Sequence, residues 1–236
     1  FVVLPLIMLV VQSITGTGVS FMAIFKQLLP ALTDSLLLSL TGASLITILG
    51  YAFATISVTF RIKISDFLLL LVFSVPAIAT GIALTSFYNT PALNFIYSSS
   101  IIVLIAFTAR FLFISQKIIA NGLMQIPHSY QEAAILMGAS SFYAFRKVVL
   151  PLVGASLFTS FFLVLIFCVS ELTTVIMVYP PGISLLPVRI YTLMANAPQS
   201  TVSTMCLIAL LFSLFLITLM LGGRNLLFNQ QWKKSQ

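Results

Sequence analysis

The chain has 236 residues, of which 60% are hydrophobic and 6% are charged, and its formal net charge is +7. A soluble domain carries about 25% charged residues, so this composition excludes a water-soluble globular protein and predicts an integral membrane protein. A single signal peptide is excluded as the cause, because the apolar runs recur along the whole chain.

Six apolar runs approach or exceed the length of a membrane span, about 20 residues. They cover residues 1–13, 31–59, 64–88, 99–116, 152–178 and 201–223. The first run begins at Phe1 rather than at a Met, so we expect the first helix to be incomplete. Only helices and closed barrels satisfy the backbone in lipid, and strand-length alternating segments are absent. The sequence therefore predicts an all-α polytopic transmembrane helical bundle of about six spans, in one domain over residues 1–236.

The basic residues lie mostly on one side of the six predicted spans. One side has only Lys26 and Arg189 between its spans. The other side has eight: Arg61, Lys63, Lys117, Arg146, Lys147, Arg224, Lys233 and Lys234. The positive-inside rule therefore predicts that both termini and the segment 117–151 are cytoplasmic. Because these residues are scattered between apolar runs, topology explains them better than a nucleic-acid surface.

Proline and glycine interrupt or flank several runs. Pro76, in FSVPAIATGIAL, has no N–H and would release backbone carbonyls midway along the run 64–88. Released carbonyls suit a pathway lining, and a simple kink is an equally good interpretation. The glycines that we expect to allow close helix packing are Gly42, Gly50, Gly81 and Gly154.

A polar segment, SYQEAAILMGASSFYAFRKVVLP, separates two of the apolar runs. Ser129 and Glu132 have the spacing of a capping box, and Pro127 fixes where the helix begins. Gly138 is the expected C′ residue of that helix, and a second helix is expected to begin behind a Ser cap and to run toward Pro151. The pattern predicts two short helices around a glycine corner outside the bilayer. A loop resting on lipid headgroups and a docking surface for a cytoplasmic partner both fit it.

The same segment resembles the EAA loop of ATP-binding-cassette importer permeases. That loop reads E-A-A, three residues, G, nine residues, then I-x-L-P. Here the matching residues are Glu132, Ala133, Ala134, Gly138 and the run 148–151, in which Val148 replaces isoleucine. The resemblance covers about the whole chain and implies the type I importer permease fold, in which two such units form one pathway. It further implies that residues 117–151 contain the coupling helix that fits a groove on the ATPase subunit.

The resemblance also implies roles and partners. Glu132 would orient the coupling helix, Ala133 and Ala134 would allow its close seating, and Gly138 would set the corner before Pro151. The sequence has no phosphate-binding glycine loop and no nucleophile–base constellation, so we expect ATP and Mg²⁺ to bind a partner. The implied partners are two ATPase subunits, a second permease subunit, identical or homologous, and an extracytoplasmic substrate-binding protein. We expect no cofactor, metal or nucleic acid in this chain, and a location in the cytoplasmic (inner) membrane of a prokaryote.

Candidate pathway residues follow in the second half of the chain, with one exception. Glu171 lies in an apolar run, where a carboxylate is costly and commonly functional, although an outer position in contact with water is an alternative. Pro181 and Gly182 are expected to end that helix, and LPVRIYTLMA is expected to form a short helix returning toward the membrane. Arg189 could pair with Glu171, attract an anion or face solvent. Arg110, near the inner end of the run 99–116, could snorkel toward headgroups or line the pathway.

The pattern E-L…PPG…L-x-V-R-I-Y between Glu171 and Tyr191 resembles permeases for ferric iron, thiamine and related ligands. Ferric iron or a related small ligand such as thiamine is therefore the expected substrate. Spermidine or putrescine, phosphonate, and sulfate or molybdate are alternatives, as is an ATP-independent secondary transporter, which would not need the EAA spacing. We expect Cys168 and Cys206 to be packing residues and His128 to be a solvated loop residue.

Overall fold

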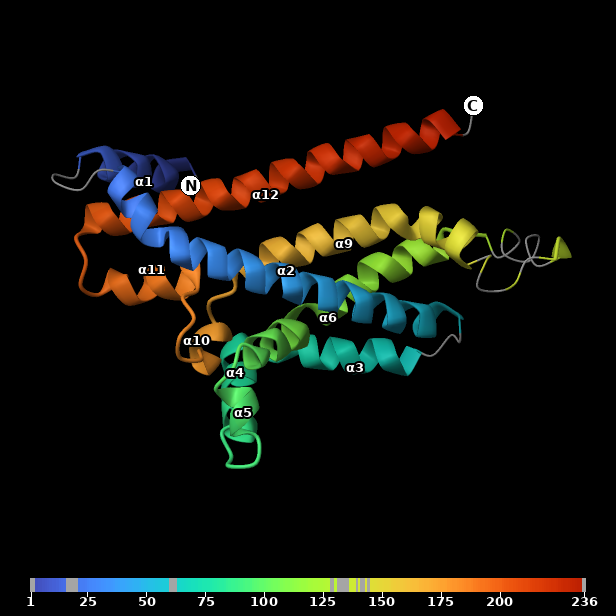
Figure 1. The fold of residues 1–236 in the computed structure, drawn as a ribbon, viewed down its shortest axis with the longest axis horizontal. Coiled ribbons are helices and arrows are strands. Elements are labelled where there is room, and N and C mark those ends of the chain that lie inside the picture. The colour runs from blue at the N-terminus through green and yellow to red at the C-terminus, as the bar shows by residue number, and fades with distance from the viewer. Residues whose placement is uncertain are drawn as a thin grey trace. The chain divides into compact units, whose positions relative to one another are not determined.

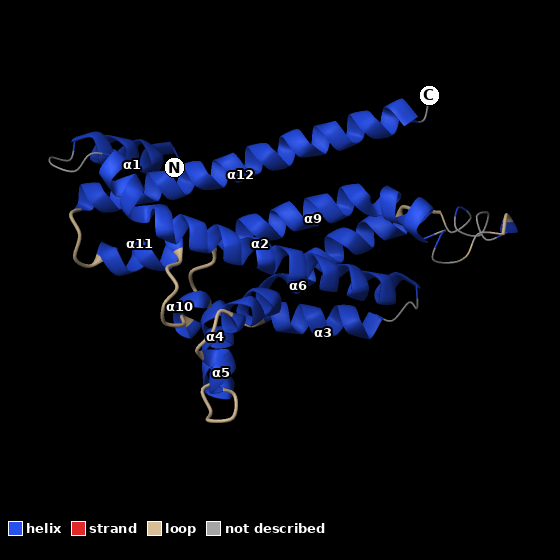
Figure 2. Ribbon diagram, viewed as in Figure 1, coloured by secondary structure: helices blue, strands red, loops and turns tan. Residues whose placement is uncertain are grey.

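The computed structural model describes residues 3–15, 21–59, 63–127, 130, 136–138, 140, 143 and 145–234. Within these residues every element of regular structure is a helix, as Figure 1 and Figure 2 show. This is the expected outcome for so apolar a chain, because a helix satisfies its own backbone polar groups in lipid. The predicted all-α class is confirmed.

The helices differ widely in length, from single turns to runs of more than thirty residues. In chain order they are α1 Val3–Thr15, α2 Phe21–Thr59, α3 Lys63–Ser74, α4 Ala77–Tyr88, α5 Asn94–Tyr97, α6 Ile101–Met124, the π-helix η1 Phe145–Val149, α9 Leu150–Ser170, α10 Val175–Val178, α11 Leu186–Met194 and α12 Gln199–Lys234.

Four helical segments are long and apolar enough to cross a membrane: α2, α6, the continuous run Phe145–Ser170 and the part Gln199–Gly223 of α12. Helices α3 and α4 make a fifth span if they are taken together. Helix α1 has 13 residues, fewer than the roughly 20 that a span requires. Each of the six predicted apolar runs corresponds to helix in the structure.

Two helices extend beyond the predicted runs. Helix α2 begins at Phe21 rather than at residue 31 and contains Pro30, which membrane helices tolerate when nearby groups satisfy the freed carbonyl. Helix α6 continues to Met124 rather than ending at residue 116. Its polar last turns remain helical until the residues before Pro127, where proline disfavours the α conformation of its predecessor.

The run 64–88 is not one helix. Helix α3 ends at Ser74 and α4 begins at Ala77, with Val75 and Pro76 between them in non-helical conformation. Pro76 has no N–H for the carbonyl of Val72, and the Val75 N–H donates to that carbonyl instead, over 3.3 Å. Proline thus breaks the helix rather than merely bending it.

The run 152–178 is also interrupted, so the prediction of one continuous span was wrong there. Helix α9 ends at Ser170 and α10 begins at Val175. Between them the Glu171 side chain accepts a hydrogen bond from the Thr174 N–H over 2.8 Å. A side-chain oxygen here takes the amide that a backbone carbonyl would take in a continuous helix.

The described chain forms two compact units, and several long helices contribute residues to both. The first unit comprises Phe1–Thr41, Ala77–Ala106 and Ile166–Ile217. Its apolar core combines one face of α2 with α11 and α12. The buried residues of this core are Ile24, Leu28, Leu32, Leu186, Met205 and Ile208.

The second unit comprises Gly42–Pro76, Phe107–Leu165 and Thr218–Gln236. Its core joins α2, α6 and α9 through small or branched side chains, which let helix backbones approach closely in a membrane. The buried residues of this core are Ala54, Ile119, Ala120 and Val153.

A buried polar contact lies close to that second core. Ser115 of α6 is fully buried, and its hydroxyl donates to the Ile46 carbonyl of α2 over 3.2 Å. The Ser160 hydroxyl of α9 donates to the Ser115 hydroxyl over 2.8 Å. Gly50 faces this contact, and a Cβ at that position would lie 2.1 Å from Ser115 Oγ. The glycine therefore permits the close approach of α2 and α6.

Candidate functional site

The predicted coupling segment is described only in part. Glu132, Ala133 and Ala134 lie outside the described residues. Gly138 is exposed, with φ of 86°, and nothing lies within 4 Å of a Cβ built at that position. The left-handed backbone, rather than lack of space, is what requires glycine here. This conformation is the one that helix C′ positions most commonly adopt.

The predicted second helix of the segment has the expected start. The Tyr143 N–H donates to the Ser140 hydroxyl oxygen over 3.2 Å, an interaction typical of an N-cap residue. The chain then forms η1, which passes directly into α9. Pro151 is exposed at the second position of α9 and has no N–H. The change from π-helix to α-helix occurs where proline cannot donate to the turn before it.

The residues that lead into this segment border empty space. Ile126 and Pro127 line three cavities of about 500, 480 and 230 Å³. The largest is also lined by Ser57, Asp66 and Lys117. Pro127 is exposed, so these are open pockets at the surface of the second unit.

Asp66 is the centre of a polar cluster that the sequence analysis missed. The Lys117 ammonium donates to its Oδ2 over 2.5 Å, and the Gln116 side-chain amide donates to its Oδ1 over 2.7 Å. Gln116 is fully buried, and Lys117 also lies over the ring of Phe113, 5.6 Å from its centroid. Asp66 occupies the first turn of α3, where a negative charge is favoured by the helix dipole. The cluster ties α3 to α6.

The sequence did contain a signal for this cluster. The whole chain has only four acidic residues, and besides Glu171 two more, Asp34 and Asp66, lie in predicted apolar runs. A carboxylate inside such a run is a functional or structural candidate by its cost alone. Both contribute tertiary hydrogen bonds in the structure.

Arg110 does not lie near the inner end of its helix, as the run 99–116 had suggested. Because α6 continues to Met124, Arg110 is well within the helix and is half-buried. Its guanidinium donates to the Val75 carbonyl over 3.1 Å and lies over the ring of Phe73, 5.9 Å from its centroid. Arg110 thus supplies a donor and a positive charge at the C-terminal end of α3, where the helix dipole favours a cation.

In the first unit, α4 and α10 pack closely against each other. A Cβ at Gly81 would lie 2.6 Å from Met177 Cβ and 3.0 Å from the Thr174 carbonyl oxygen. The Thr85 hydroxyl donates to the Met177 carbonyl over 2.9 Å, which satisfies one of the carbonyls left over at the end of the single-turn α10. This contact holds the residues that follow Glu171.

The turn that follows α10 agrees with the prediction. Pro181 and Gly182 are exposed, and Gly182 has φ of 85°, so this turn also requires glycine. The predicted short helix is α11. Arg189 is exposed on it and makes no ion pair with Glu171 among the ion pairs of the described residues. The structure therefore does not support an ion pair with Glu171, which was one of the three roles considered for Arg189.

The first turn of α11 is held by residues of α2. The Leu186 N–H donates to the Ser35 hydroxyl over 2.7 Å, and the Ser184 N–H donates to Asp34 Oδ2 over 3.1 Å. Pro187, the next residue, has no N–H. The side chain of the N-cap residue, Leu185, makes no capping hydrogen bond. Ser35 and Asp34 instead accept from the backbone at this end of α11, as an N-cap side chain would, although they lie about 150 residues away in the chain.

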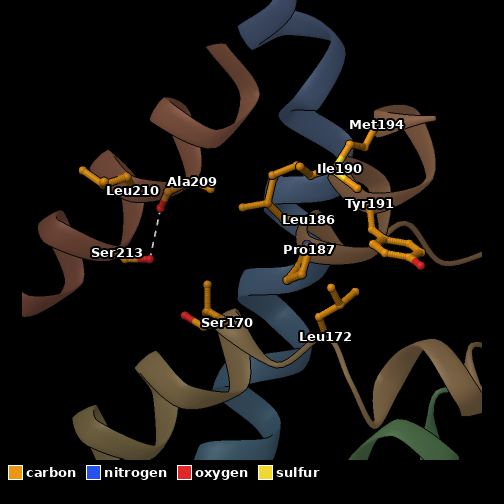
Figure 3. A pocket seen from close by; sticks show the side chains of 11 residues that line it. Ser170, Leu172, Leu186, Pro187, Ile190, Tyr191, Met194, Ala209, Leu210 and Ser213 are labelled. Atoms are coloured by element: carbon orange, nitrogen blue, oxygen red, sulfur yellow. Dashed lines mark hydrogen bonds between the residues drawn. The ribbon is translucent and has the colours of Figure 1, made fainter. Parts of the chain in front are cut away.

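A cavity of about 390 Å³ lies beside α11 in the first unit. Figure 3 shows the lining side chains gathered from the end of α9, from α11 and from α12, with apolar groups predominating. Ser170 and Leu172 line the cavity, whereas Glu171 between them does not. Pro187 and Ile190 line it, whereas Arg189 does not. The two charged candidates therefore lie off the cavity wall.

No group of three or more His, Cys, Asp or Glu side chains comes together among the residues that the structure describes. Cys168 is buried and Cys206 is half-buried, and both are free thiols. They pack within helices α9 and α12, as predicted. His128 lies outside the described residues.

Comparison with known proteins decides the family. The profile of the family described as "Binding-protein-dependent transport system inner membrane component" matches residues 46–227. The chain belongs to this family. It is thus a membrane-embedded permease component of a binding-protein-dependent transport system and is not itself catalytic.

The permease is similar to curated proteins of two transport systems. It is 24% identical over 212 residues to the Fe(3+)-transport system permease protein FbpB 2 of Haemophilus influenzae, covering 89% of this chain and 42% of that protein. It is 27% identical over 229 residues to the permease protein PhnV of Salmonella paratyphi A, provisionally assigned to 2-aminoethylphosphonate transport, covering 89% of this chain and 85% of that protein. The permease thus spans less than half the length of the first relative and most of the second.

Two solved structures share the fold. The MetNI methionine ABC transporter, in inward facing conformations, matches with a TM-score of 0.70 at 16% identity, over 85% of this chain and 95% of that chain. A bacterial ABC transporter that imports the acidic polysaccharide alginate matches with a TM-score of 0.67 at 15% identity, over 93% of this chain and 89% of that chain. The predicted importer permease fold is confirmed.

Proposed function

We propose that this permease forms half of an import pathway for ferric iron or a related small ligand, and that it docks a cytoplasmic ATPase through the coupling helix within residues 117–151. Two ATPase subunits, a second permease subunit and an extracytoplasmic binding protein would complete the importer. Both termini would lie in the cytoplasm. ATP and Mg²⁺ would bind the ATPases and not this chain.

The observation that carries the docking proposal is the spacing of the EAA segment together with the backbone at its corner. Glu132 and Gly138 stand at the separation that the family's coupling helix requires. Gly138 adopts the left-handed conformation that ends a helix, and Ser140 caps the helix that follows. The helix, corner and second helix that the sequence predicts here would together suit a groove on a partner.

Coupling would follow from closure of the ATPases. When ATP brings the two ATPases together, the coupling segments would move with them and open the outward side of the pathway. The cavities around Ile126 and Pro127 leave room for the base of this segment to move. Glu132 would orient the segment, and Ala133 and Ala134 would permit close seating.

The pathway residues of this proposal are those at helix interruptions. Glu171 and the Pro181–Gly182 turn flank α10, and Arg189 is exposed on α11. The Arg110 guanidinium, from α6, reaches the Val75 carbonyl at the break after α3. Broken helices present polar backbone groups at membrane depth only where protein or a water-filled cavity surrounds them. These positions would therefore be the ones to border the moving substrate.

Ferric iron is the first substrate candidate because FbpB 2 is named for Fe(3+) transport and because the region from Glu171 to Tyr191 resembles that branch. A 2-aminoethylphosphonate or similar phosphonate is the second candidate, supported by the match to most of the length of PhnV. In either case the binding protein would supply affinity and this chain the passage.

The docking test uses two matched glycines. Gly138 and Gly182 are both exposed, have φ of 86° and 85°, and have nothing within 4 Å of a built Cβ. Gly138→Val and Gly182→Val therefore strain the backbone alike, but only the first lies in the coupling segment. We expect Gly138→Val to lose co-purification of the ATPase subunits, and Gly182→Val to keep it. Equal ATPase recovery in both variants would refute the docking role of the corner.

The substrate test measures uptake into proteoliposomes that contain the assembled importer. The extracytoplasmic binding protein is loaded with ⁵⁵Fe³⁺ in one arm and with labelled 2-aminoethylphosphonate in the other. ATP-dependent accumulation in the iron arm alone supports the first candidate, and accumulation in the phosphonate arm alone replaces it with the second. Accumulation in neither arm refutes both.

A further inference from the structure

We propose that Asp34 and Ser35 are positioning residues for transport, which hold the N-terminal end of α11 and with it one wall of the 390 Å³ cavity. This inference rests on the proposed function. Neither residue was a candidate from sequence, and neither is part of the coupling segment. Both lie on α2, far in the chain from the helix that they hold.

The hydrogen bonds of the α11 N-terminus show what the pair does. Leu185, the N-cap residue, is extended, with φ of −96° and ψ of 135°, and its apolar side chain caps nothing. The Leu186 N–H is satisfied by Ser35 and the Ser184 N–H by Asp34. Pro187 removes one donor from the first turn. Without Asp34 and Ser35, the N–H groups of Ser184 and Leu186 at the beginning of α11 would lose these acceptors.

Burial makes these bonds matter. Ser35 has 1% of its surface exposed and Leu186 has 2%, so water cannot replace the hydroxyl as an acceptor. An unpaired N–H at such a depth is strongly disfavoured. The carboxylate of Asp34 adds a negative charge at the positive end of the α11 dipole. The two residues thus secure α11 by hydrogen bonding and by charge.

The held residue is also part of the cavity. Leu186 belongs to the buried core of the first unit and lines the cavity, as do Pro187, Ile190, Tyr191 and Met194 farther along α11. In Figure 3 these side chains form one wall and face the residues from α12 across the cavity. A shift of the α11 N-terminus must therefore change the shape of the cavity.

The residues just before this junction do not hold it by other side-chain hydrogen bonds to α2 among the described residues. Gly182 has open space around it, and the hydrogen bond from the Tyr179 hydroxyl to the Ile183 carbonyl stays within the turn itself. Asp34 and Ser35 thus supply the hydrogen bonds to α2 where this turn passes into α11, beside the apolar packing of Leu186 against α2. A carboxylate is costly in a membrane helix and unnecessary for packing alone, which is why we assign the pair a role in transport.

The test compares Asp34→Ala and Ser35→Ala with Thr33→Ala in the assembled importer. Thr33 is the neighbouring polar residue, and its hydroxyl bonds only carbonyls of its own helix in the hydrogen bonds of the described residues, those of Leu29 and Pro30. We expect each of the first two variants to lower the maximal uptake rate about tenfold, because Ser35→Ala removes a buried hydrogen bond and Asp34→Ala removes a partly buried one together with a charge at the helix end. Thr33→Ala should match the wild type. ATPase co-purification should persist in all three, which separates failure of this inference from failure of the docking proposal.

Two conservative variants and a direct readout decide the case even if an alanine variant fails to assemble. Asp34→Asn and Ser35→Thr each keep an acceptor oxygen, and each should retain uptake within about threefold of the wild type. Amide hydrogen exchange of a peptide covering residues 183–190 should be faster in Ser35→Ala than in Thr33→Ala. Unchanged exchange and uptake in Ser35→Ala would overturn the proposal, as would loss of uptake in Thr33→Ala to the same extent.

Discussion

Replacing Gly50 with alanine should destabilise the second unit, because no room exists for the added methyl group. The new Cβ would lie 2.1 Å from Ser115 Oγ, 2.8 Å from Ser115 Cβ and 3.2 Å from the Gln116 backbone nitrogen. Ordinary van der Waals contacts begin at 3.4 Å. The Ser115 side chain cannot simply rotate away, because it bonds the Ile46 carbonyl and the Ser160 hydroxyl.

The magnitude follows from the two ways of relieving this clash. Rotating Ser115 sacrifices two hydrogen bonds, at about 1 kcal/mol each. Separating α2 from α6 instead costs about 1–3 kcal/mol, as overpacking in cores does. Against this cost, alanine has a higher helix propensity than glycine, which stabilises a helix interior by about 1 kcal/mol. The net loss in the free energy of unfolding is therefore about 1 kcal/mol, or roughly 2–4 °C in Tm for a chain of this size.

The assay is the Tm of the purified permease in detergent, measured by loss of the monodisperse peak after heating. Gly154→Ala is the matched control, since Gly154 lies inside α9 and a Cβ there has nothing within 4 Å. We expect its Tm to rise by a few degrees, because only the helix propensity changes. The double variant Gly50→Ala with Ser115→Gly should recover part of the loss, since it removes both clashing atoms. A rise in Tm for Gly50→Ala like that of the control would refute this account of the helix contact.

Three further outcomes follow from other contacts. Gly81→Ala should reduce stability by about 1–3 kcal/mol, because its Cβ would press on backbone as well as on a side chain of α10, and thermal unfolding of the variant against Gly154→Ala measures this. Lys117→Met should lower the free energy of unfolding by about 1–2 kcal/mol, a value between those for exposed and buried ion pairs. The same substitution should cost less in an Asp66→Asn background, and an equal cost in both backgrounds would show that the two residues are not coupled. Arg110→Leu should speed amide hydrogen exchange in the last turn of α3, and Arg110→Lys should speed it less. Exchange rates equal to that of the wild type in both variants would contradict the hydrogen bond to Val75.

The helical class and the family could be predicted from sequence because both depend on local properties. A backbone in lipid must satisfy its own hydrogen bonds, so apolar length alone predicts helices. The EAA segment is contiguous, and its glycine, serine and proline act within one or two turns. Gly138 and Ser140 accordingly adopt the conformation and the hydrogen bond that the sequence predicted.

The interruptions of the spans were only half predictable. Pro76 was visible as a break, since its missing N–H is a property of the residue itself. The sequence did not show that Arg110 donates to the carbonyl at this break, because the position of an arginine along one helix does not reveal which helix packs beside it. Glu171 was recognised as unusual, yet its use as an acceptor for the Thr174 N–H, which separates α9 from α10, emerged only from the structure.

Composition, span length and one contiguous motif thus determined from sequence alone that this chain is a helical importer permease, and the motif predicts a coupling segment. Tertiary structure alone decided which polar groups meet across helices. Asp34 holds the beginning of α11, 150 residues away, and Asp66 bonds Lys117, 51 residues away. The physical reason is that hydrophobic burial is non-directional and fixes only which residues avoid water. Partner choice depends on where packed helices place each donor and acceptor, and sequence spacing does not encode that placement.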